Sequence, residues 1–452
     1  MAHQIGKVRQ VMMTHKARAG LVLFVLIIAS LLYMTRVNWR DPSLKHGDNP
    51  SLLEAKRILQ GEITLPERVH DTALSGGEPV NVFQPGQTLF FLIQLAVVGE
   101  RILEVFQVQM FLLFVLSTLS LGLALFYLSD GRLILSVSLA ISAMLGAPYI
   151  ASLRLMMVGS VYRVNHCLSA LFVIGFLILL GRRWSKKAPL LVGACIGGAM
   201  LFRAQNVLLL VLPLSVFFQS SDGKTWRFSD AVSTPVARRE LVRYVTILAV
   251  FPVLALIIVG VFQTLRFHNP FETGYAAIYE GRSGYLAQRA NRYGLFSLHF
   301  LPENLYRTFF ALPTFQFDGW RISEIVADPR GNSLLASQPV LLLGLMLWRS
   351  VKNARAQSFV FTSLLLAIPV WLYHNPGFYA PGYMRLSLDY LLLWIATLAV
   401  LARYATSSRI LKWASIVLAI LAVLYGIALW NLELSVPDLS LLTSYPSNRS
   451  LA

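Results

Sequence analysis

Charge is scarce in this chain, and most of it has one sign. Only 13% of the 452 residues are Asp, Glu, Lys or Arg, whereas 56% are hydrophobic, and 39 basic residues outnumber 22 acidic ones. Soluble domains carry about 25% charged residues, so this composition excludes an ordinary soluble chain. The two cysteines, Cys167 and Cys195, both lie in apolar runs. They exclude a disulfide framework for the polar loops, and neither their spacing nor their neighbours indicate a metal site.

Long hydrophobic runs occupy most of the remaining sequence. A membrane core of roughly 30 Å takes about 20 helical residues to cross, and runs of about this length recur along the chain. We therefore predict an all-α, polytopic bundle of about eleven spans that forms a single domain over residues 1–452. The predicted spans are 19–35, 105–128, 133–152, 159–181, 188–202, 205–219, 244–265, 336–348, 357–373, 387–402 and 412–430. The two short spans between 188 and 219 are expected to form a broken helical hairpin inside the bundle.

The basic residues collect in alternate loops between these spans. They are Lys7, Arg9, Lys16, Arg18, Arg182, Arg183, Lys186, Lys187, Lys224, Arg227, Arg238, Arg239, Arg243, Arg349, Lys352, Arg355, Arg403, Arg409 and Lys412. This asymmetry follows the positive-inside rule, so the net charge of +17 indicates a membrane protein rather than a nucleic-acid-binding one. It predicts a cytoplasmic amino terminus and two large external loops, 37–104 and 266–335. Segment 19–35 has no cleavage site after it and is predicted to be a retained anchor.

The first external loop holds seven carboxylates between Asp41 and Glu78. Within it, residues 50–61 are predicted to form a short amphipathic helix, with Asn49 as its cap and Gly61 as its stop. Leu52, Ala55 and Leu59 share one face of this helix, and Glu54 and Arg57 can pair on another. Such a helix would lie along the membrane surface.

Asp48 stands at the start of that helix, beside the end of the first predicted span. Two interpretations are open from the local sequence. The carboxylate favours the positive end of the helix dipole, or it activates and positions an acceptor at the boundary between water and lipid.

A resemblance favours the second interpretation. Gly47-Asp48-Asn49-Pro50, followed by an apolar helix and Leu59-Gln60-Gly61, resembles the first external loop of the GT-C membrane glycosyltransferases. Other segments resemble further elements of this family in the same order. They are Phe83-Gln84-Pro85-Gly86-Gln87, Leu201-Phe202-Arg203-Ala204-Gln205-Asn206, the run from Leu265 to Tyr275, Phe296-Ser297, Leu301-Pro302-Glu303-Asn304-Leu305-Tyr306 and the run from Tyr383 to Tyr390.

The resemblance covers residues 19–403 and implies a GT-C-like fold with juxtamembrane helices in the first external loop. It also implies an enzyme that moves a hexose or pentose from a polyprenyl-phosphate carrier, with Asp48 as the catalytic carboxylate. One departure is clear, because Asn49 stands where many members have the second acid of a pair. No cofactor is required by this interpretation, and a divalent cation is permitted but not indicated.

Five arginines are predicted at the external ends of spans, on the side that basic residues normally avoid. They are Arg154, Arg163, Arg203, Arg266 and Arg385. Each can extend toward the interface or pair with an acid such as Asp389 or Glu272. As a group they predict a cationic pocket for the phosphate of a lipid carrier, because guanidinium groups match phosphate oxygens. His166 is a further, weaker candidate beside Arg163.

Aromatic and polar side chains alternate in the second external loop and after residue 372. Aromatic faces with interleaved polar groups bind sugar rings, although they also form interfacial belts. We select Glu272, Tyr275 and His374 as candidate residues for binding the sugar or acceptor.

The sequence thus predicts an inverting glycosyltransferase with its site at the external, periplasmic face of a bacterial inner membrane. Its expected partners are a polyprenyl-phosphate sugar, membrane lipids and a glycolipid, polysaccharide or protein acceptor, with no nucleic acid. Two alternatives stay open: a lipid-linked sugar transporter or flippase, and a non-catalytic membrane partner derived from the same fold.

Overall fold

The computed structural model describes most of the chain after residue 48. The described residues are 49–69, 72–157, 159–182, 188–220, 223–227, 234–279, 284–318, 321–326, 332–375, 385–406 and 409–432. The first predicted span, 19–35, and Asp48 lie outside them.

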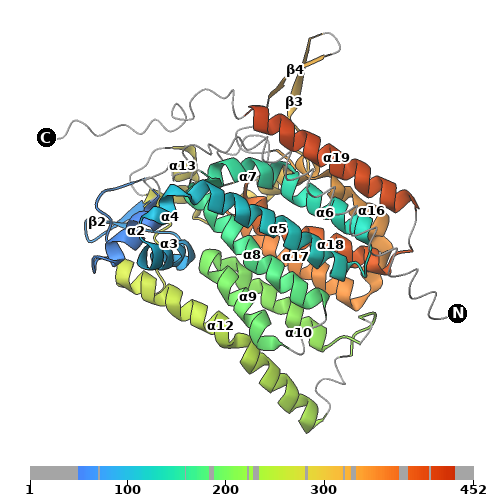
Figure 1. Cartoon of the computed structure of the whole chain (residues 1–452), viewed down its shortest axis with the longest axis horizontal. Coiled ribbons are helices and arrows are strands. Elements are labelled where there is room, and N and C mark those ends of the chain that lie inside the picture. The colour runs from blue at the N-terminus through green and yellow to red at the C-terminus, as the bar shows by residue number, and fades with distance from the viewer. Residues whose placement is uncertain are drawn as a thin grey trace.

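Helices make up most of the described chain and lie side by side in a bundle (Figure 1). The bundle helices are α5 (Phe106–Leu128), α6 (Leu133–Leu145), α7 (Ala147–Met157), α8 (Val161–Gly181), α9 (Pro189–Phe202), α10 (Val211–Phe217), α12 (Pro235–Phe267), α17 (Ala354–Leu372), α18 (Leu391–Tyr404) and α19 (Arg409–Leu432). Five of the described helices are long and apolar enough to cross a membrane, namely α5, α8, α12, α17 and α19. The chain is therefore that of an integral membrane protein, while the expected number of about eleven spans stays a prediction.

Two glycines allow a close contact between α9 and α12. A Cβ atom at Gly193 would come within 2.2 Å of the Leu248 carbonyl oxygen, and one at Gly197 within 2.6 Å of the Phe251 oxygen. Small residues four apart let two membrane helices approach backbone to backbone. Because α9 also packs on α8, these contacts place α9 between α8 and α12.

Several predicted spans are interrupted. The run at 133–152 is divided at Gly146 into α6 and α7, and the run at 336–348 consists of short pieces. Those pieces are α15 (Leu334–Ser337), η4 (Pro339–Leu342), α16 (Leu343–Leu347) and η5 (Trp348–Lys352). Between 188 and 219 the break falls at Arg203, where the backbone is extended before the 3₁₀ helix η1 (Ala204–Leu210). The predicted break in this hairpin is confirmed.

The first external loop forms a small, ordered layer against the end of the bundle. It contains α2 (Pro50–Ile58), β1 (Thr72–Ser75), β2 (Glu78–Asn81), α3 (Pro85–Val98) and α4 (Arg101–Glu104). The Asn49 side chain caps α2, Pro50 occupies its first turn, and Gly61 follows with a left-handed φ of 84°. These three features of the predicted helix are confirmed.

Two other expectations for this helix are wrong. Glu54 does not pair with Arg57, which instead contacts Glu62 and the Thr64 carbonyl. Leu52 and Ala55 do not face lipid, because they are buried against the protein core, whereas Leu59 is 52% exposed. The glutamate is also fully buried, so the polar and apolar sides of α2 both contact protein.

The predicted all-α class agrees with the mostly helical chain, and two short antiparallel hairpins add to it. β1 pairs with β2, and β3 (Thr314–Asp318) pairs with β4 (Arg321–Val326). The four-residue strands of the first hairpin turn at Gly76 and Gly77, both with positive φ. The described part of the second external loop also contains short helices: η2 (Ala277–Tyr279), α13 (Tyr285–Tyr293), η3 (Leu298–Phe300) and α14 (Leu301–Phe309).

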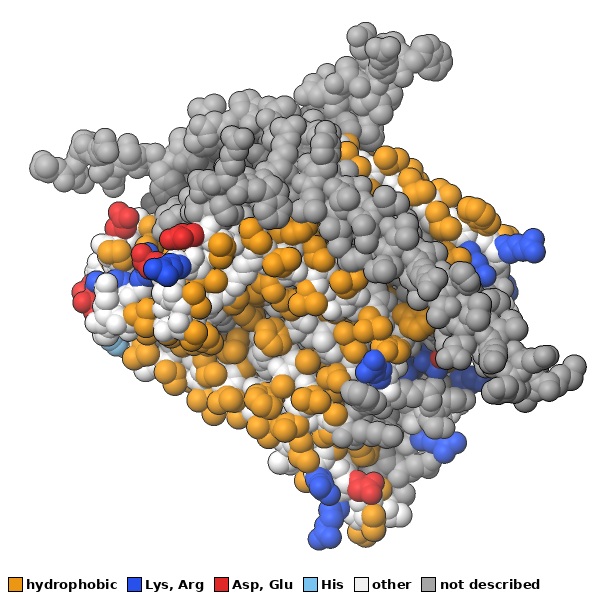
Figure 2. All heavy atoms as spheres, viewed as in Figure 1, with side chains coloured by type: hydrophobic (Ala, Val, Ile, Leu, Met, Phe, Trp, Pro, Cys, Tyr) orange, Lys and Arg blue, Asp and Glu red, His pale blue; other side chains and the backbone are white. Residues whose placement is uncertain are grey.

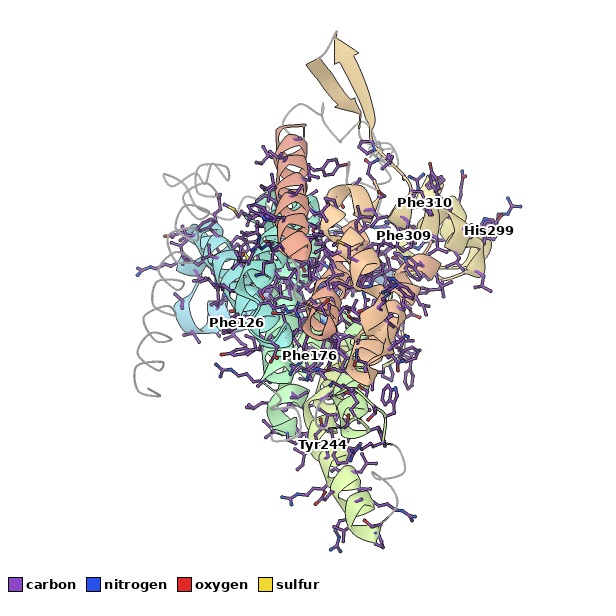
Figure 3. The ribbon with its side chains drawn as sticks, turned by 90° about the vertical axis from the view of Figure 1, so that its right-hand side faces the viewer. Phe126, Phe176, Tyr244, His299, Phe309 and Phe310 are labelled. Atoms are coloured by element: carbon purple, nitrogen blue, oxygen red, sulfur yellow. The ribbon has the colours of Figure 1, made fainter. Side chains whose placement is uncertain are left out.

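Charged side chains differ between the two ends of the bundle. In Figure 2 acidic and basic side chains lie together near α2 and β2, whereas mostly Lys and Arg side chains lie around the amino-terminal end of α12, and hydrophobic side chains cover the surface between them. Figure 3 shows the same two ends, with Tyr244 of α12 at one and His299 and Phe310 at the other. The apolar band between the ends is the surface expected to face lipid.

Candidate functional site

The break after α9 brings Arg203 to a buried carboxylate. Arg203 donates from Nε to Oδ1 of Asp389 over 2.8 Å, and its Nη2 forms an ion pair with Oδ2 of the same residue. Asp389 ends the 3₁₀ helix η6 (Arg385–Asp389), and only 1% of its side chain is exposed. Two parallel contacts fix the plane of a guanidinium group as well as its position. Of the Arg203 side chain 18% stays exposed, and Nη1 takes no part in the contacts with Asp389.

His166 of α8 contacts the same carboxylate. Its Nδ1 lies 3.0 Å from Asp389 Oδ1, and the imidazole is almost completely buried. A contact at Nδ1 selects the orientation of the ring. No hydrogen-bond partner for His166 Nε2 is found among the described residues.

A cavity of about 10 Å³ adjoins this group and is lined by His166, Ser169, Asn206 and Asp389 together with aliphatic side chains. Its volume is close to that of one water molecule, and Asn206 donates to Ser169 Oγ at 2.8 Å beside it. The polar lining can therefore hold a single water between the three helical segments.

Arg163 lies on α8 one turn before His166 and is only 3% exposed. Residues three apart on a helix share a face, so Arg163 is directed toward the same region as His166. Tyr275 and Tyr373 are close enough to Arg203 for electrostatic interaction with it. Three of the predicted residues, Arg163, Arg203 and Tyr275, thus converge from α8, the α9 break and the second external loop.

The first external loop is attached to this region by Asn49. Its Nδ2 donates to the Gly159 carbonyl over 2.7 Å, and its Oδ1 accepts from the Ser51 and Leu52 amides. Gly159 lies between α7 and α8, four residues before Arg163. Asn49 follows Asp48 in the sequence, and the described chain begins with this contact to the turn before α8.

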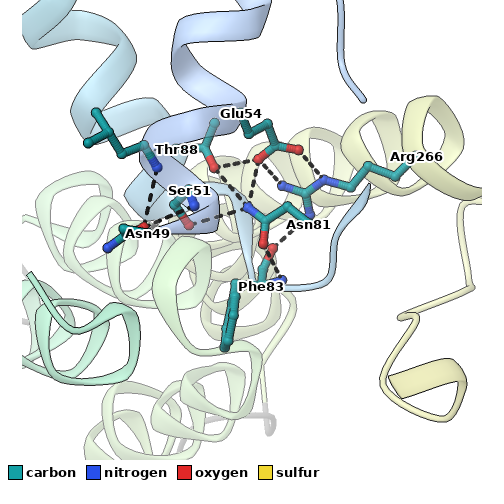
Figure 4. Close-up of polar contacts among 8 residues, drawn as sticks. Asn49, Ser51, Glu54, Asn81, Phe83, Thr88 and Arg266 are labelled. Atoms are coloured by element: carbon teal, nitrogen blue, oxygen red, sulfur yellow. Dashed lines mark hydrogen bonds and ion pairs between the residues drawn. The ribbon is translucent and has the colours of Figure 1, made fainter. Parts of the chain in front are cut away.

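A second attachment joins α2 to the end of α12 (Figure 4). Arg266 donates to Glu54 from Nε at 2.6 Å and from Nη2 at 2.5 Å, and from Nη1 to the Phe83 carbonyl at 2.7 Å. Asn81 and Thr88 also donate to Glu54, at 2.8 and 2.5 Å. Neither charged side chain is exposed. All three nitrogens of Arg266 have protein acceptors, so these contacts give no support to the phosphate-binding role predicted for it.

The carboxyl end of α17 is held by α13 and α14. Asn304 donates to the Trp371 and Tyr373 carbonyls, and Arg289 donates from Nε to the His374 carbonyl, each at 2.8 Å. Burial lowers the pKa of His374 to about 4, with the Arg289 charge acting in the same direction. The histidine is therefore neutral near pH 7 and packs against the rings of Tyr279 and Tyr373.

Glu303 links two arginines in the same cluster. Burial alone would raise the pKa of Glu303, but hydrogen bonds from Arg289 and Arg307 outweigh it and hold the pKa below its ordinary value. This ionised group stabilises the arrangement of α13 and α14 next to His374.

Other predicted residues are not brought into the Arg203 region. Glu272 is exposed and accepts from the Gly274 amide at 2.8 Å, as in a local turn. Arg154 and Arg385 belong to α7 and η6, and their side chains lie outside the described part of the structure. Among the described residues, no group of three or more His, Cys, Asp or Glu side chains could hold a metal ion.

The sequence analysis did not predict Asp389 as a residue of the site. It treated this residue only as a possible partner for an arginine, whereas Asp389 orients both Arg203 and His166. A signal was present, because an acid within an otherwise apolar run is costly in a membrane and usually has a specific partner.

The sequence matches no protein-family model and no curated protein. Among solved structures it is similar to the apo crystal structure of an oligosaccharyltransferase from Archaeoglobus fulgidus, with 13% identity and a TM-score of 0.48. The match covers 94% of this chain, which spans 58% of the length of the archaeal protein. Similarity this low assigns neither a family nor an activity.

Proposed function

We propose that the chain is an inverting glycosyltransferase that takes its sugar from a polyprenyl-phosphate carrier at the external face of the membrane. The observation that supports this proposal is that Arg163 and an oriented, partly exposed Arg203 both approach the His166 and Asp389 pair, while Asn49 contacts the turn before the helix that carries Arg163. Asp48 precedes this contact in the sequence, and we propose it as the carboxylate that acts with these fixed cations, a combination that suits attack on a carbon carrying a phosphate leaving group. The ordered resemblance to GT-C enzymes adds to this support.

In the proposed reaction an acceptor hydroxyl oxygen attacks the anomeric carbon from the side opposite the phosphate. Asp48 takes the hydroxyl proton, and the bond between the carbon and the phosphate oxygen breaks with its electron pair retained by the phosphate. Arg203 and Arg163 offset the charge that develops on that oxygen, so no separate general acid is needed.

The roles of the other residues follow from their contacts. Asp389 orients Arg203 through two hydrogen bonds, and the buried pair of Glu54 and Arg266 holds the first external loop against α12. Tyr275 and the neutral His374 are proposed to line the space for the sugar or acceptor.

One observation favours a second candidate, a transporter of lipid-linked anions. Transporters use broken helices near the middle of the membrane to bind substrates, and the chain breaks at Gly146 and at Arg203. A transporter would move the lipid-linked sugar without cleaving it, so the two candidates differ in whether free carrier phosphate is formed.

The test uses purified protein in lipid nanodiscs with a panel of polyprenyl-phosphate sugars and acceptors. Release of free polyprenyl phosphate is followed by mass spectrometry for wild type, Asp48→Asn and Arg203→Gln. We expect turnover by the wild type and its loss in both variants, while Arg239→Gln, an exposed change at the amino-terminal end of α12, stays active. Equal turnover in Asp48→Asn would remove this residue from the chemistry. Movement of intact lipid-linked sugar without cleavage would replace the transferase by the transporter.

A further inference from the structure

A second cavity, of about 250 Å³, lies where three bundle helices end. It is lined by residues from the ends of α5, α8 and α18 and from the turn between α5 and α6, namely Phe126, Tyr127, Asp130, Gly131, Gly181, Arg182 and Arg403. We refer to it as the Arg182–Arg403 cavity. The cavity beside His166 has about 10 Å³ by comparison, so this one admits far more than a single water.

The Arg182–Arg403 cavity lies at the boundary between apolar helices and basic loops. α5 and α8 are both long and apolar enough to cross a membrane, and both reach the cavity with their carboxyl ends. Arg355 at the start of α17 donates to the Leu180 carbonyl at 2.9 Å, so a further basic loop meets the same end of the bundle. In a membrane, the phosphate groups of phospholipids lie at this level, just beyond the hydrocarbon core.

Two guanidinium groups line the cavity from different helices. Arg182 donates from Nη2 to the Tyr127 hydroxyl oxygen over 2.6 Å, and its guanidinium carbon lies 4.7 Å from the centre of the same ring. Arg403 is 10% exposed, and its Nη2 lies 3.4 Å from Oδ1 of Asp130, whose side chain is 70% exposed. Charge-assisted hydrogen bonds are about 2.7–2.9 Å long, so this last contact is loose.

The charges of the lining side chains do not balance. Two guanidinium groups and one carboxylate leave an excess of one positive charge around the cavity. Arginines near the carboxyl end of a helix also complement the helix dipole, which accounts for their presence but not for the cavity between them. A ligand with one negative charge would balance the lining.

An exposed apolar stripe on α5 leads to the cavity. Four leucines of this helix are between 42% and 59% exposed, namely Leu112, Leu116, Leu119 and Leu123. Their spacing of four, three and four residues puts them on one face of the helix, and the next positions on that face are Phe126 and Tyr127 in the cavity lining. A ligand with an acyl chain would use both the stripe and the cavity, whereas a soluble anion would use the cavity alone.

We propose that the Arg182–Arg403 cavity binds the phosphodiester headgroup of an anionic phospholipid, with an acyl chain along the α5 stripe. Guanidinium groups match phosphate oxygens, and basic pockets between membrane helices bind anionic headgroups. A phosphodiester carries the single negative charge that the lining lacks. This site shares no lining residue with the cavity beside His166, and the inference does not depend on the proposed function.

The test measures the Kd of phosphatidylglycerol for delipidated protein in detergent micelles by native mass spectrometry. Wild type is compared with the double variant Arg182→Gln/Arg403→Gln. The matched control is Arg239→Gln/Arg243→Gln, which removes the same charge from exposed positions in the amino-terminal part of α12. The Kd should rise by at least about 10-fold in the first double variant and by less than about twofold in the control.

A gain of affinity is expected from Asp130→Asn, and misfolding cannot imitate it. The residue has a left-handed φ of 62°, which asparagine also tolerates. Because the change releases Arg403 from its carboxylate, the Kd of phosphatidylglycerol should fall by about threefold. The control is Glu240→Gln, which removes an exposed acid on α12 and should leave the Kd unchanged.

Two further arms distinguish a lipid from a soluble anion and locate the lipid. Inorganic phosphate and glycerol 3-phosphate, each at millimolar concentration, should not displace phosphatidylglycerol. Phosphatidylglycerol with a photoactivatable acyl chain should label residues 112–127, and this labelling should fall in Arg182→Gln/Arg403→Gln.

Four results would each overturn the inference. They are an equal Kd in the two double variants, no gain of affinity in Asp130→Asn, displacement of the lipid by either soluble anion, and unchanged labelling of α5 in Arg182→Gln/Arg403→Gln.

Discussion

Removing one member of the buried pair of Glu54 and Arg266 should destabilise the protein more than removing both charges together. The pair has no exposed surface, and its two hydrogen bonds are 2.5 and 2.6 Å long. In Arg266→Met the Glu54 carboxylate would keep only Asn81 and Thr88 as donors, and the Phe83 carbonyl would lose its guanidinium. Leaving a buried charge without its partner costs about 3–5 kcal/mol.

Glu54→Gln should lose a similar amount, because the guanidinium of Arg266 then lacks a counter-charge. In the double variant no net charge is buried, so its loss should be at least about 2 kcal/mol smaller than the sum of the two single losses, within the range of coupling found for contacting residues. The free energy of unfolding would be measured by denaturant titration of the protein in mixed micelles, with helix content followed by circular dichroism.

The control is Lys56→Met on the same helix. Lys56 lies 2.5 Å from Glu100, but 38% and 73% of these side chains are exposed, so no measurable loss is expected. The reasoning that a buried charge pair attaches this loop would be refuted by either of two results. Each single variant could lose less than about 1 kcal/mol of the free energy of unfolding, or the loss in the double variant could equal the sum of the two single losses.

Three further outcomes are expected. Gly197→Val should destabilise the bundle by about 1–3 kcal/mol, because even a Cβ atom meets the Phe251 oxygen at 2.6 Å; unfolding titrations should show this, and an unchanged midpoint would contradict the close α9–α12 contact. The free energy of unfolding should fall as the pH decreases from about 6.5 to about 4, because His374 then binds a proton in the unfolded chain but not in the folded protein, where its pKa is about 4. His374 contributes a slope of at most about 1.4 kcal/mol per pH unit to this free energy, and the contribution should vanish in His374→Phe. Arg203→Lys should raise the KM for the donor by about 10-fold with little change in folding, because an ammonium group cannot keep both contacts to Asp389. Steady-state kinetics with a functional donor measures this KM, and an unchanged value would show that Arg203 does not contact the phosphate.

The hydrophobic pattern predicts many of the helices of this fold, because helix formation depends mainly on residues that are close in the sequence. Apolar runs located α5, α8, α12, α17 and α19, and the cap and stop of α2 were readable from Asn49, Pro50 and Gly61. Local sequence also indicated the break at Arg203. These features depend on backbone preferences and helical periodicity, which act over a few residues.

Long-range partners could not be read in the same way. Glu54 and Arg57 are suitably spaced to pair on a helix, yet Glu54 contacts a residue 212 positions away. The packing of α2 against α3 decides this outcome, because it buries Glu54 completely and leaves 28% of the Arg57 side chain exposed. Likewise, the short first hairpin depends on packing of Val80 and Val82 under Tyr162 and Tyr275 rather than on a strong strand pattern.

The distance along the chain between Glu54 and Arg266 has a consequence for synthesis. At 5–20 residues per second, a ribosome takes about 10–40 s to make the 212 residues that separate them. During that interval Glu54 lacks its partner Arg266, so its carboxylate stays hydrated. The contact between α2 and α12 can therefore form only after Arg266 has been made, and a truncated chain that ends before residue 266 would carry every residue of α2 without this contact.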